Sequence, residues 1–140
     1  MLDIYNTSSQ SVGASSLITY NAARINQGGA TTFTPTSDTF YIVSPGIYKI
    51  IFSGVAAATT TATSPNEVQL YQGSTAVAGA TASELSESTT DFVNLSFSVL
   101  LPVSKADLAA TTTASLALSV ENIGIAATFT NADVTVVKVR

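Results

Sequence analysis

Residues 38–58, with the sequence DTFYIVSPGIYKIIFSGVAAA, constrain the fold more than any other part of the chain. They are rich in Val, Ile, Tyr, Phe and Thr, which favour strands, and the pair Pro45-Gly46 marks a turn. Nothing in them is typical of a helix start. The segment is therefore predicted to form a β-hairpin in the core of an all-β fold.

The second strand of this hairpin is apolar on both of its faces. Alternate side chains of a strand point to opposite sides, so Tyr48, Ile50 and Phe52 share one face. The opposite face carries three more apolar residues and two polar ones: Ile47, Ile51 and Val55, with Lys49 and Ser53. Such a strand needs two partners to cover it. One is the second sheet of a sandwich, and in a short chain the other is most economically a second copy of the same chain.

The composition is that of a small all-β domain. With 140 residues the chain has the usual size of one domain, so we expect a single domain over residues 1–140, in which residues 1–16 form an N-terminal arm or docking segment. Hydrophobic residues make up 46% of the chain, which excludes a disordered protein. Charged residues make up only 10%, so Ser, Thr, Asn, Gln and Ala must cover most of the surface.

Charge and residue types exclude several functions. A net charge of −4 and a total of five Lys and Arg argue against nucleic-acid binding. Without His or Cys the chain has no disulfide, no Ser-His-Asp or Cys-His catalytic group and no zinc site of the common kind. The N-terminus lacks the pattern of a signal peptide and no apolar stretch is long enough to span a membrane, so we expect a protein made in the cytoplasm.

The rest of the chain reads as short strands between turn residues. The clearest is 92–103, where apolar residues alternate with polar ones: Val93, Leu95, Phe97, Val99 and Leu101. A second hairpin is predicted over 67–71 and 74–80, around Gly73. Residues 105–110 form either one helical turn or a loop. Further strands cover 114–122, 126–130 and 133–139, the last two separated by a turn at Asn131-Ala132. About eight to ten strands without a long helix predict a sandwich, with a jelly roll as the leading form.

Taken in order, these segments resemble the TNF/C1q-like jelly-roll family. The resemblance rests on Phe40 followed by Pro45-Gly46-x-Tyr48-x-x-x-Phe52, on the hairpin Leu70-Tyr71-x-Gly73, on the apolar strand 92–101 and on the closing segment TFTNADVTVVKV, residues 128–139. It covers most of the chain from about residue 17 onward. The nearest likeness is to bacterial and phage members, such as the C-terminal domain of the collagen-like glycoprotein of the bacillus exosporium.

This resemblance implies a compact homotrimer whose inner sheets meet around a threefold axis. By the same analogy the segments 17–20, 47–57, 92–101 and 134–139 form the inner sheet. This agrees with the two apolar faces of the second hairpin strand. The residues expected at the subunit interface are Ile47, Ile51, Val55, Tyr20 and Val137.

No residue pattern indicates a catalytic or cofactor site. Glu84, Glu87 and Asp91 lie within eight residues and are interpreted as a solvated acidic loop; calcium binding and glycosidase-type catalysis are the alternatives. Asn131 and Asp133 are interpreted as turn residues rather than as ligands. Lys49 either pairs across a subunit interface or reaches solvent at the sheet edge.

Three tyrosines remain open between packing and stacking on sugars, with packing the expected role: Tyr20, Tyr41 and Tyr71.

The expected function is that of a non-enzymatic structural protein of a phage virion, a trimeric decoration, head-fibre or tail-fibre module. The alternative is an adhesion module that binds carbohydrate or protein on a bacterial spore or cell-surface filament. We expect no cofactor, no nucleic acid and no membrane insertion. The expected partners are two further copies of the chain, other virion or surface proteins, and in the adhesion case a glycan of the host surface.

Overall fold

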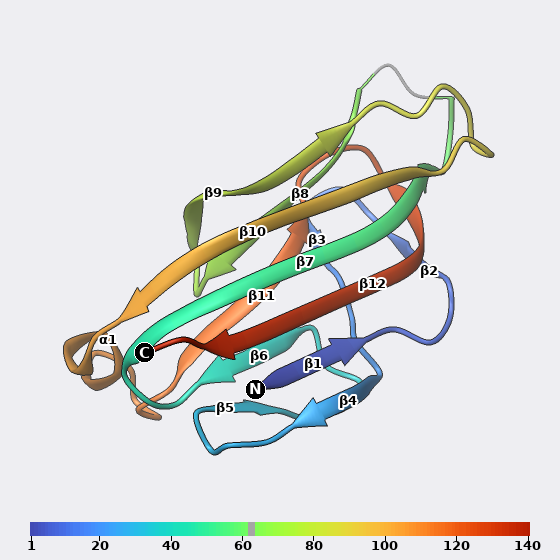
Figure 1. Ribbon diagram of the computed structural model, residues 1–140. Helices are drawn as coiled ribbons and strands as arrows, with labels where there is room; N and C mark the ends of the chain where they lie inside the picture. The colour runs from blue at the N-terminus through green and yellow to red at the C-terminus, as the bar shows by residue number, and fades with distance from the viewer. Residues whose placement is uncertain (62–63) are drawn as a thin grey trace.

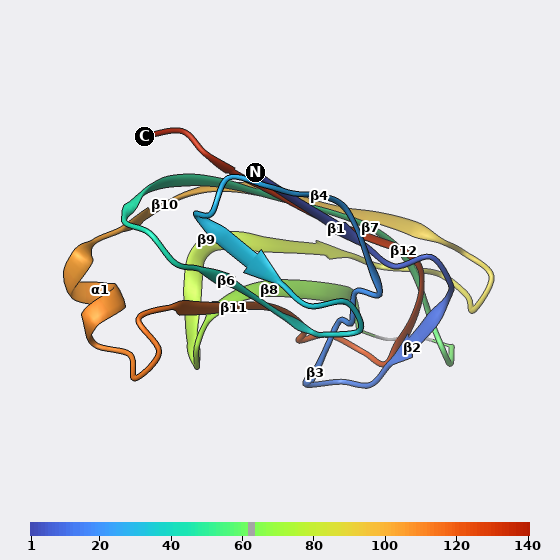
Figure 2. The same ribbon diagram turned by 90° about the horizontal axis from the view of Figure 1, so that it is seen from below.

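The computed structural model describes residues 1–61 and 64–140 and consists of two antiparallel β-sheets that lie face to face (Figures 1 and 2). Sheet A contains β1 (Leu2–Tyr5), β2 (Gln10–Val12), β4 (Ala22–Asn26), β7 (Gly46–Ala58), β10 (Val93–Val103) and β12 (Ala127–Lys138). Sheet B contains β3 (Ser16–Leu17), β5 (Thr31–Phe33), β6 (Thr39–Ile42), β8 (Asn66–Gln72), β9 (Thr75–Glu84) and β11 (Leu116–Asn122). The predicted all-β sandwich is confirmed.

Three long strands form the body of sheet A. Its order is β10-β7-β12-β1-β4, and β2 pairs with the far end of β12. β7 pairs with β10 from Gly46 to Ala56 and with β12 from Tyr48 to Ala58. The hairpin predicted over residues 38–58 is wrong as a pairing: its two strands form, as β6 and β7, but β6 pairs with β5 and β11 in sheet B, and β7 pairs with β10 and β12 in sheet A. The connection at Pro45-Gly46 therefore crosses from one sheet to the other. β10 is an edge strand, which accommodates Pro102 because an edge strand can spare one ladder hydrogen bond.

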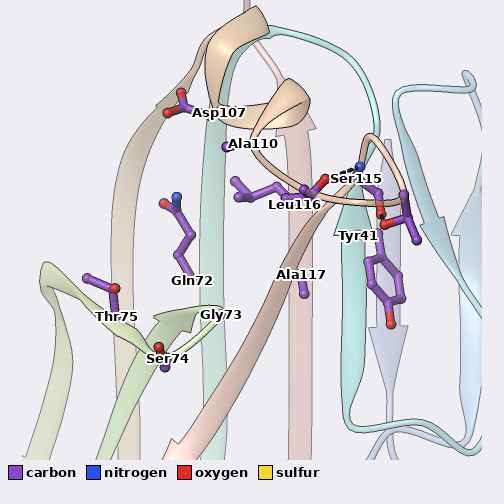
Figure 3. A pocket seen from close by; sticks show the side chains of 12 residues that line it. Tyr41, Gln72, Gly73, Ser74, Thr75, Asp107, Ala110, Ser115, Leu116 and Ala117 are labelled. Carbon is purple, nitrogen blue, oxygen red and sulfur yellow. Dashed lines mark hydrogen bonds between the residues drawn. The ribbon is translucent and has the colours of Figure 1, made fainter.

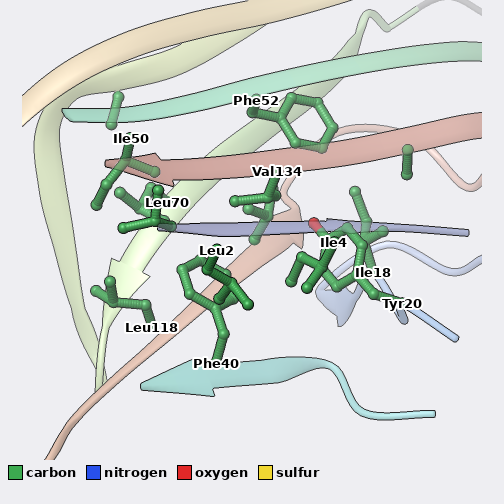
Figure 4. Packing of buried hydrophobic residues seen from close by; sticks show 14 of the residues in the cluster. Leu2, Ile4, Ile18, Tyr20, Phe40, Ile50, Phe52, Leu70, Leu118 and Val134 are labelled. Atoms are coloured by element: carbon green, nitrogen blue, oxygen red, sulfur yellow. The ribbon is translucent and has the colours of Figure 1, made fainter. Parts of the chain in front are cut away.

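The core fills the space between the inner faces of the two sheets (Figure 4). Sheet A contributes Tyr48, Ile50 and Phe52 from β7, and Figure 4 shows Phe52 beside Val134 of β12. Sheet B contributes Phe40, Leu70 and Leu118, all without exposed surface. The ring of Phe52 stacks on that of Phe97 with centroids 5.4 Å apart. One hydrophobic cluster thus joins both sheets.

The N-terminal segment is part of this sandwich, which corrects the expectation for residues 1–16. β1 lies between β12 and β4, and Leu2 and Ile4 have no exposed surface. β2 continues the pairing with β12. These residues therefore complete the core of their own subunit instead of forming an arm that docks on a neighbour. In β1 the buried Leu2 and Ile4 alternate with Asp3 and Tyr5, which is the pattern of a strand. A pattern of only four residues is too short to be recognised as a strand from the sequence.

The segment 17–20 also lies elsewhere than expected. β3, which contains Leu17, pairs with β11 of sheet B, and Tyr20 makes a single bridge to Ser37. The inner-sheet position assigned to this segment is taken by β1 and β4. The other three segments assigned to that sheet lie there, as β7, β10 and β12.

The C-terminal strand is continuous where a turn is predicted at Asn131-Ala132. β12 runs from Ala127 to Lys138, and its pairing with β7 shifts by one residue between Phe129 and Asn131. This irregularity is a β-bulge, which inserts an extra residue without ending the strand. The strand persists because it has paired neighbours on both sides, β7 on one and β2 and β1 on the other.

The segment 105–110, left open between helix and loop, contains the helix α1 (Lys105–Ala109). Ser104 is its N-cap: the Ser104 hydroxyl accepts a hydrogen bond from the backbone N–H of Asp107, and the Asp107 carboxylate accepts one from the backbone N–H of Ser104. This reciprocal pair satisfies donors that a helix start leaves free. α1 closes the end of the sandwich between β10 and β11 (Figure 1).

Candidate functional site

The face of sheet A that points away from the core is the first candidate site. On β7 this outer face carries Ile47, Ile51 and Val55, each partly exposed, in alternation with the buried residues of the core. No described strand or helix of the chain crosses this face (Figure 2). The structure thus brings three of the five expected interface residues together on one open surface.

Neighbouring strands extend this apolar surface. Val137 of β12 is partly exposed and pairs with Lys49, which lies between Ile47 and Ile51. On the other side Lys49 pairs with Leu100 of β10, which is 60% exposed. Lys49 therefore stands exposed among aliphatic side chains, and both interpretations of it, pairing across an interface or reaching solvent, remain open.

Tyr20 does not belong to this surface, and its assignment to the subunit interface is wrong. The side chain has no exposed surface and lies in the core near Ile4 and Ile18 (Figure 4). Its hydroxyl is buried and has no hydrogen-bond partner among the described residues. Burial raises the pKa of the Tyr20 phenol far above its ordinary value, because the phenolate would lose its solvation. Of the two roles left open for Tyr20, the structure supports packing.

A charged cluster lies on the same outer face, towards β1 and β4. The guanidinium of Arg24 donates two hydrogen bonds of 3.0 Å to the carboxylate of Asp3 and forms an ion pair with Asp133 of β12. It also stacks over the ring of Tyr5, 4.4 Å from its centroid. The hydrogen bond to Asp3 is the main cause that raises the pKa of Arg24. Asp133 is therefore an ion-pair partner and not a turn residue.

Sequence reasoning missed Asp3 and Arg24. They are 21 residues apart and meet because β1 and β4 pair side by side. The alternation of β1 places the Asp3 side chain on the face of the strand opposite to Leu2 and Ile4, but no local sequence pattern links Asp3 to Arg24.

The second candidate site is an open pocket with a volume of about 630 Å³ beside α1 (Figure 3). Three parts of the chain form it: the β8–β9 turn, the segment from α1 to the start of β11, and Tyr41 of β6. Ala117 of β11 lies between Tyr41 and the β8–β9 turn. It pairs with Tyr41, and its carbonyl accepts a hydrogen bond from the backbone N–H of Gly73. Figure 3 shows Gln72 and Tyr41 on opposite sides of Ala117.

Internal hydrogen bonds hold one wall of this pocket. The Thr111 hydroxyl donates to the carbonyl of Leu108 and accepts from the backbone N–H of Ser115. The hydroxyls of Thr113 and Ser115 lie 2.6 Å apart. The carboxylate of Asp107 accepts from the N–H and hydroxyl of Ser104, and these bonds hold the pKa of Asp107 below its ordinary value. The pocket wall therefore has a fixed shape and one carboxylate.

The acidic loop between β9 and β10 contains Glu87 and Asp91, and Glu84 ends β9. The Asp91 carboxylate accepts a hydrogen bond of 2.7 Å from the backbone N–H of Glu87, which closes the loop on itself. Over residues 1–61 and 64–140, no three His, Cys, Asp or Glu side chains lie close enough together to hold a metal ion.

Comparison with known proteins gives a likeness in fold. No protein-family model matches the chain, and no curated protein matches its sequence. Eiger TNF from S. frugiperda aligns with a TM-score of 0.65 at 10% identity, over 99% of this chain and 92% of that chain. Murine APRIL aligns at 0.61 with 12% identity, over 95% of each chain. PRD1 vertex protein P5 aligns at 0.56 with 16% identity, over 95% of this chain and 93% of that chain.

These identities are too low to show more than a shared fold. The alignments with Eiger TNF and murine APRIL confirm that the chain has a TNF-like jelly-roll fold, as its residue pattern suggests. The finer likeness to the exosporium glycoprotein has no support from the sequence comparisons.

Proposed function

We propose that this chain is a non-enzymatic structural subunit of a virus particle and that it works as a homotrimer, as a decoration, head-fibre or tail-fibre module of a phage. The observation that carries this proposal is the open apolar outer face of sheet A, with Ile47, Ile51, Val55 and Val137. Its fold likeness to PRD1 vertex protein P5 supports the particle context.

The chemistry of the outer face favours another protein surface as its cover. β-Branched side chains at four positions, with Leu100 beside them, expose apolar area that water solvates poorly. A second copy of the chain is the simplest cover, because every subunit then supplies and receives the same contact. The number three comes from the resemblance to TNF/C1q-like jelly rolls.

Lys49 and the Arg24 cluster fit this interface in different ways. Arg24 is paired with the two carboxylates of Asp3 and Asp133, which leaves one net negative charge, so a neighbour that covers the cluster has to supply a cation or leave it a path to solvent. Lys49 makes no ion pair among the described residues, so a trimer needs an acceptor for it from the adjacent subunit or a path to solvent.

The alternative, an adhesion module on a bacterial spore or cell-surface filament, has one observation in its favour, the open polar pocket beside α1. A particle component can carry such a pocket as well, so the two functions differ in context. Neighbouring genes separate them: portal, capsid and tail genes support the virion, and sporulation genes support the spore. No helix among the described residues is long and apolar enough to cross a membrane.

Size-exclusion chromatography with light scattering tests the assembly directly. For the chain at about 10 μM we expect three times the subunit mass of 14.3 kDa. A monomer at this concentration would remove the main support of the proposal. A dimer would keep the covered outer face and overturn the threefold arrangement.

A further inference from the structure

We propose that the pocket beside α1 binds a neutral saccharide. The pocket lies at the end of the sandwich where the β8–β9 turn, the segment after α1 and β6 meet (Figure 3). Its volume of about 630 Å³ falls within the range of small-ligand sites, about 300 to 1,000 Å³. The inference concerns a separate surface and does not depend on the proposed trimer.

Tyr41 is the aromatic residue among those that line the pocket. It points away from the core on sheet B and is 37% exposed, which is high for so large a side chain. Its partners across the sheet are Thr32 of β5 and Ala117 of β11, and the small Ala117 side chain leaves the adjacent space open. A tyrosine ring combines an apolar face, which packs on the C–H groups of a sugar, with a polar hydroxyl at its tip.

The opposite side of the pocket supplies hydrogen-bonding groups that the fold has not used. Gln72, Ser74 and Thr75 line the pocket, and no side chain of these three makes a hydrogen bond to another described residue. Gln72 offers both donors and an acceptor, and each hydroxyl offers one donor and two acceptor sites. Such groups match the hydroxyls of a sugar, which both donate and accept.

The charge of the pocket selects against acidic ligands. Asp107 is the single charged side chain among its lining residues, and its hydrogen bonds from Ser104 keep it a carboxylate. Neither Lys nor Arg lines the pocket. A sulfated or sialylated sugar would therefore meet a like charge without a cation, whereas a neutral sugar can donate a hydroxyl to the carboxylate.

An array of immobilised glycans, with neutral and sialylated members in equal number, tests the proposal on the full-length protein. We expect retention on a subset of the neutral glycans and none on their sialylated counterparts. Retention confined to acidic glycans, or no retention at all with the protein at 100 μM, would overturn the proposal.

Two variants then tie the binding to this pocket. Tyr41→Ala should weaken the affinity for the best glycan at least tenfold, since it removes the aromatic residue of the pocket. Ser74→Arg should do the same by filling the pocket, and Ser74 is exposed on a turn, so this change leaves the fold intact. The matched control is Tyr71→Ala, which removes the other tyrosine of the same sheet face outside the pocket. If the control weakens binding as much as Tyr41→Ala, or if neither pocket variant changes it, the site lies elsewhere.

Discussion

The outer faces of the two sheets differ sharply, although both belong to strands with the same alternation. The outer face of sheet A bears aliphatic side chains on three neighbouring strands: Ile47, Ile51, Val55, Leu100 and Val137. The outer face of sheet B bears no Ile, Leu or Val on β6, β8 and β11, and its side chains there are polar, aromatic or small: Thr39, Tyr41, Glu67, Gln69, Tyr71, Ala117, Ser119 and Glu121.

The sandwich therefore has one outer face with a cluster of aliphatic side chains and one whose central strands carry polar, aromatic and small side chains. Both inner faces contribute apolar side chains to one core, so the need to fill the core does not explain the asymmetry. The aliphatic residues of sheet A's outer face add nothing to the core of their own subunit. They make sense as a surface that is covered when subunits assemble.

The largest effect is expected from a charge on the outer face of sheet A. Ile51→Asp would place an unpaired carboxylate in the proposed interface, which costs several kcal/mol. We expect the variant to elute as a monomer at about 10 μM, or to fail to fold. Light scattering and circular dichroism distinguish these results.

The control places the same charge on the other outer face. Tyr71→Asp lies on β8, partly exposed, and should leave the assembly unchanged. If both variants assemble like the parent protein, the two faces are equivalent and the comparison fails.

The next effect contrasts the two faces of one strand. Phe52→Ala removes a fully buried ring that stacks on Phe97, and it should lower the free energy of unfolding by about 3 to 5 kcal/mol. Val55→Ala, three residues along β7 on the outer face, should leave the fold of the single subunit nearly unchanged and act on assembly. Urea unfolding monitored by circular dichroism at two protein concentrations separates subunit stability from assembly. Phe52→Ala should lower the free energy of unfolding at both concentrations, whereas the effect of Val55→Ala should depend on the concentration.

A smaller effect concerns a tyrosine in the core and its pH dependence. The pKa of Tyr20 is raised by burial, whereas a tyrosine of the unfolded chain ionises near its ordinary value of about 10. Above that pH the unfolded chain loses a proton that the folded state keeps, so the stability contributed by Tyr20 is present below pH 10 and is lost as the pH rises.

Tyr20→Phe removes this ionisation together with an unpartnered buried hydroxyl. We expect a gain of about 1 kcal/mol at neutral pH, a weaker loss of stability between pH 10 and 11, and unchanged assembly. Thermal melts across this pH range measure it. If the Tyr20→Phe variant were a monomer, this result would support a place for Tyr20 at the subunit interface and contradict its place in the core.

The smallest effect tests the charges of the outer face of sheet A. Arg24→Ala leaves the carboxylates of Asp3 and Asp133 without their shared cation and should destabilise the protein by about 1 kcal/mol at low salt, less at high salt. Lys49→Ala, which removes a cation without an ion pair among the described residues, should change the stability of the subunit by about 0.5 kcal/mol or less. If Arg24→Ala and Lys49→Ala changed the stability equally, the ion pairs of Arg24 would contribute nothing to the stability of the protein.

Long alternating segments made much of this fold predictable. β7 and β10 extend over 13 and 11 residues, and their apolar periods identify both strands and the side chains that share a face. Short elements were less accessible: β1 has four residues, and the bulge of β12 looks like a turn because Asn131 is typical of turns. In the second case the neighbouring strands decide the outcome, since they continue the hydrogen-bond ladder past the extra residue.

The residues of the candidate sites also differ in how far the sequence predicts their positions. Ile47, Ile51, Val55 and Val137 follow from alternation, because a residue's side of the strand is set by its own position. Tyr20 has no alternating context and was placed wrongly. The pocket was out of reach, since Tyr41, Gln72 and Asp107 come from parts of the chain that only the fold brings together.

An all-β sandwich and the two apolar faces of β7 can both be predicted from the order of the residues, because the period of two belongs to the backbone geometry of a strand. The folded chain was needed to show which of those faces fills the core, which strands lie beside it, and which carboxylates pair with Arg24. These depend on contacts between residues far apart in the chain, and they are chosen by what packs together without voids rather than by any local pattern.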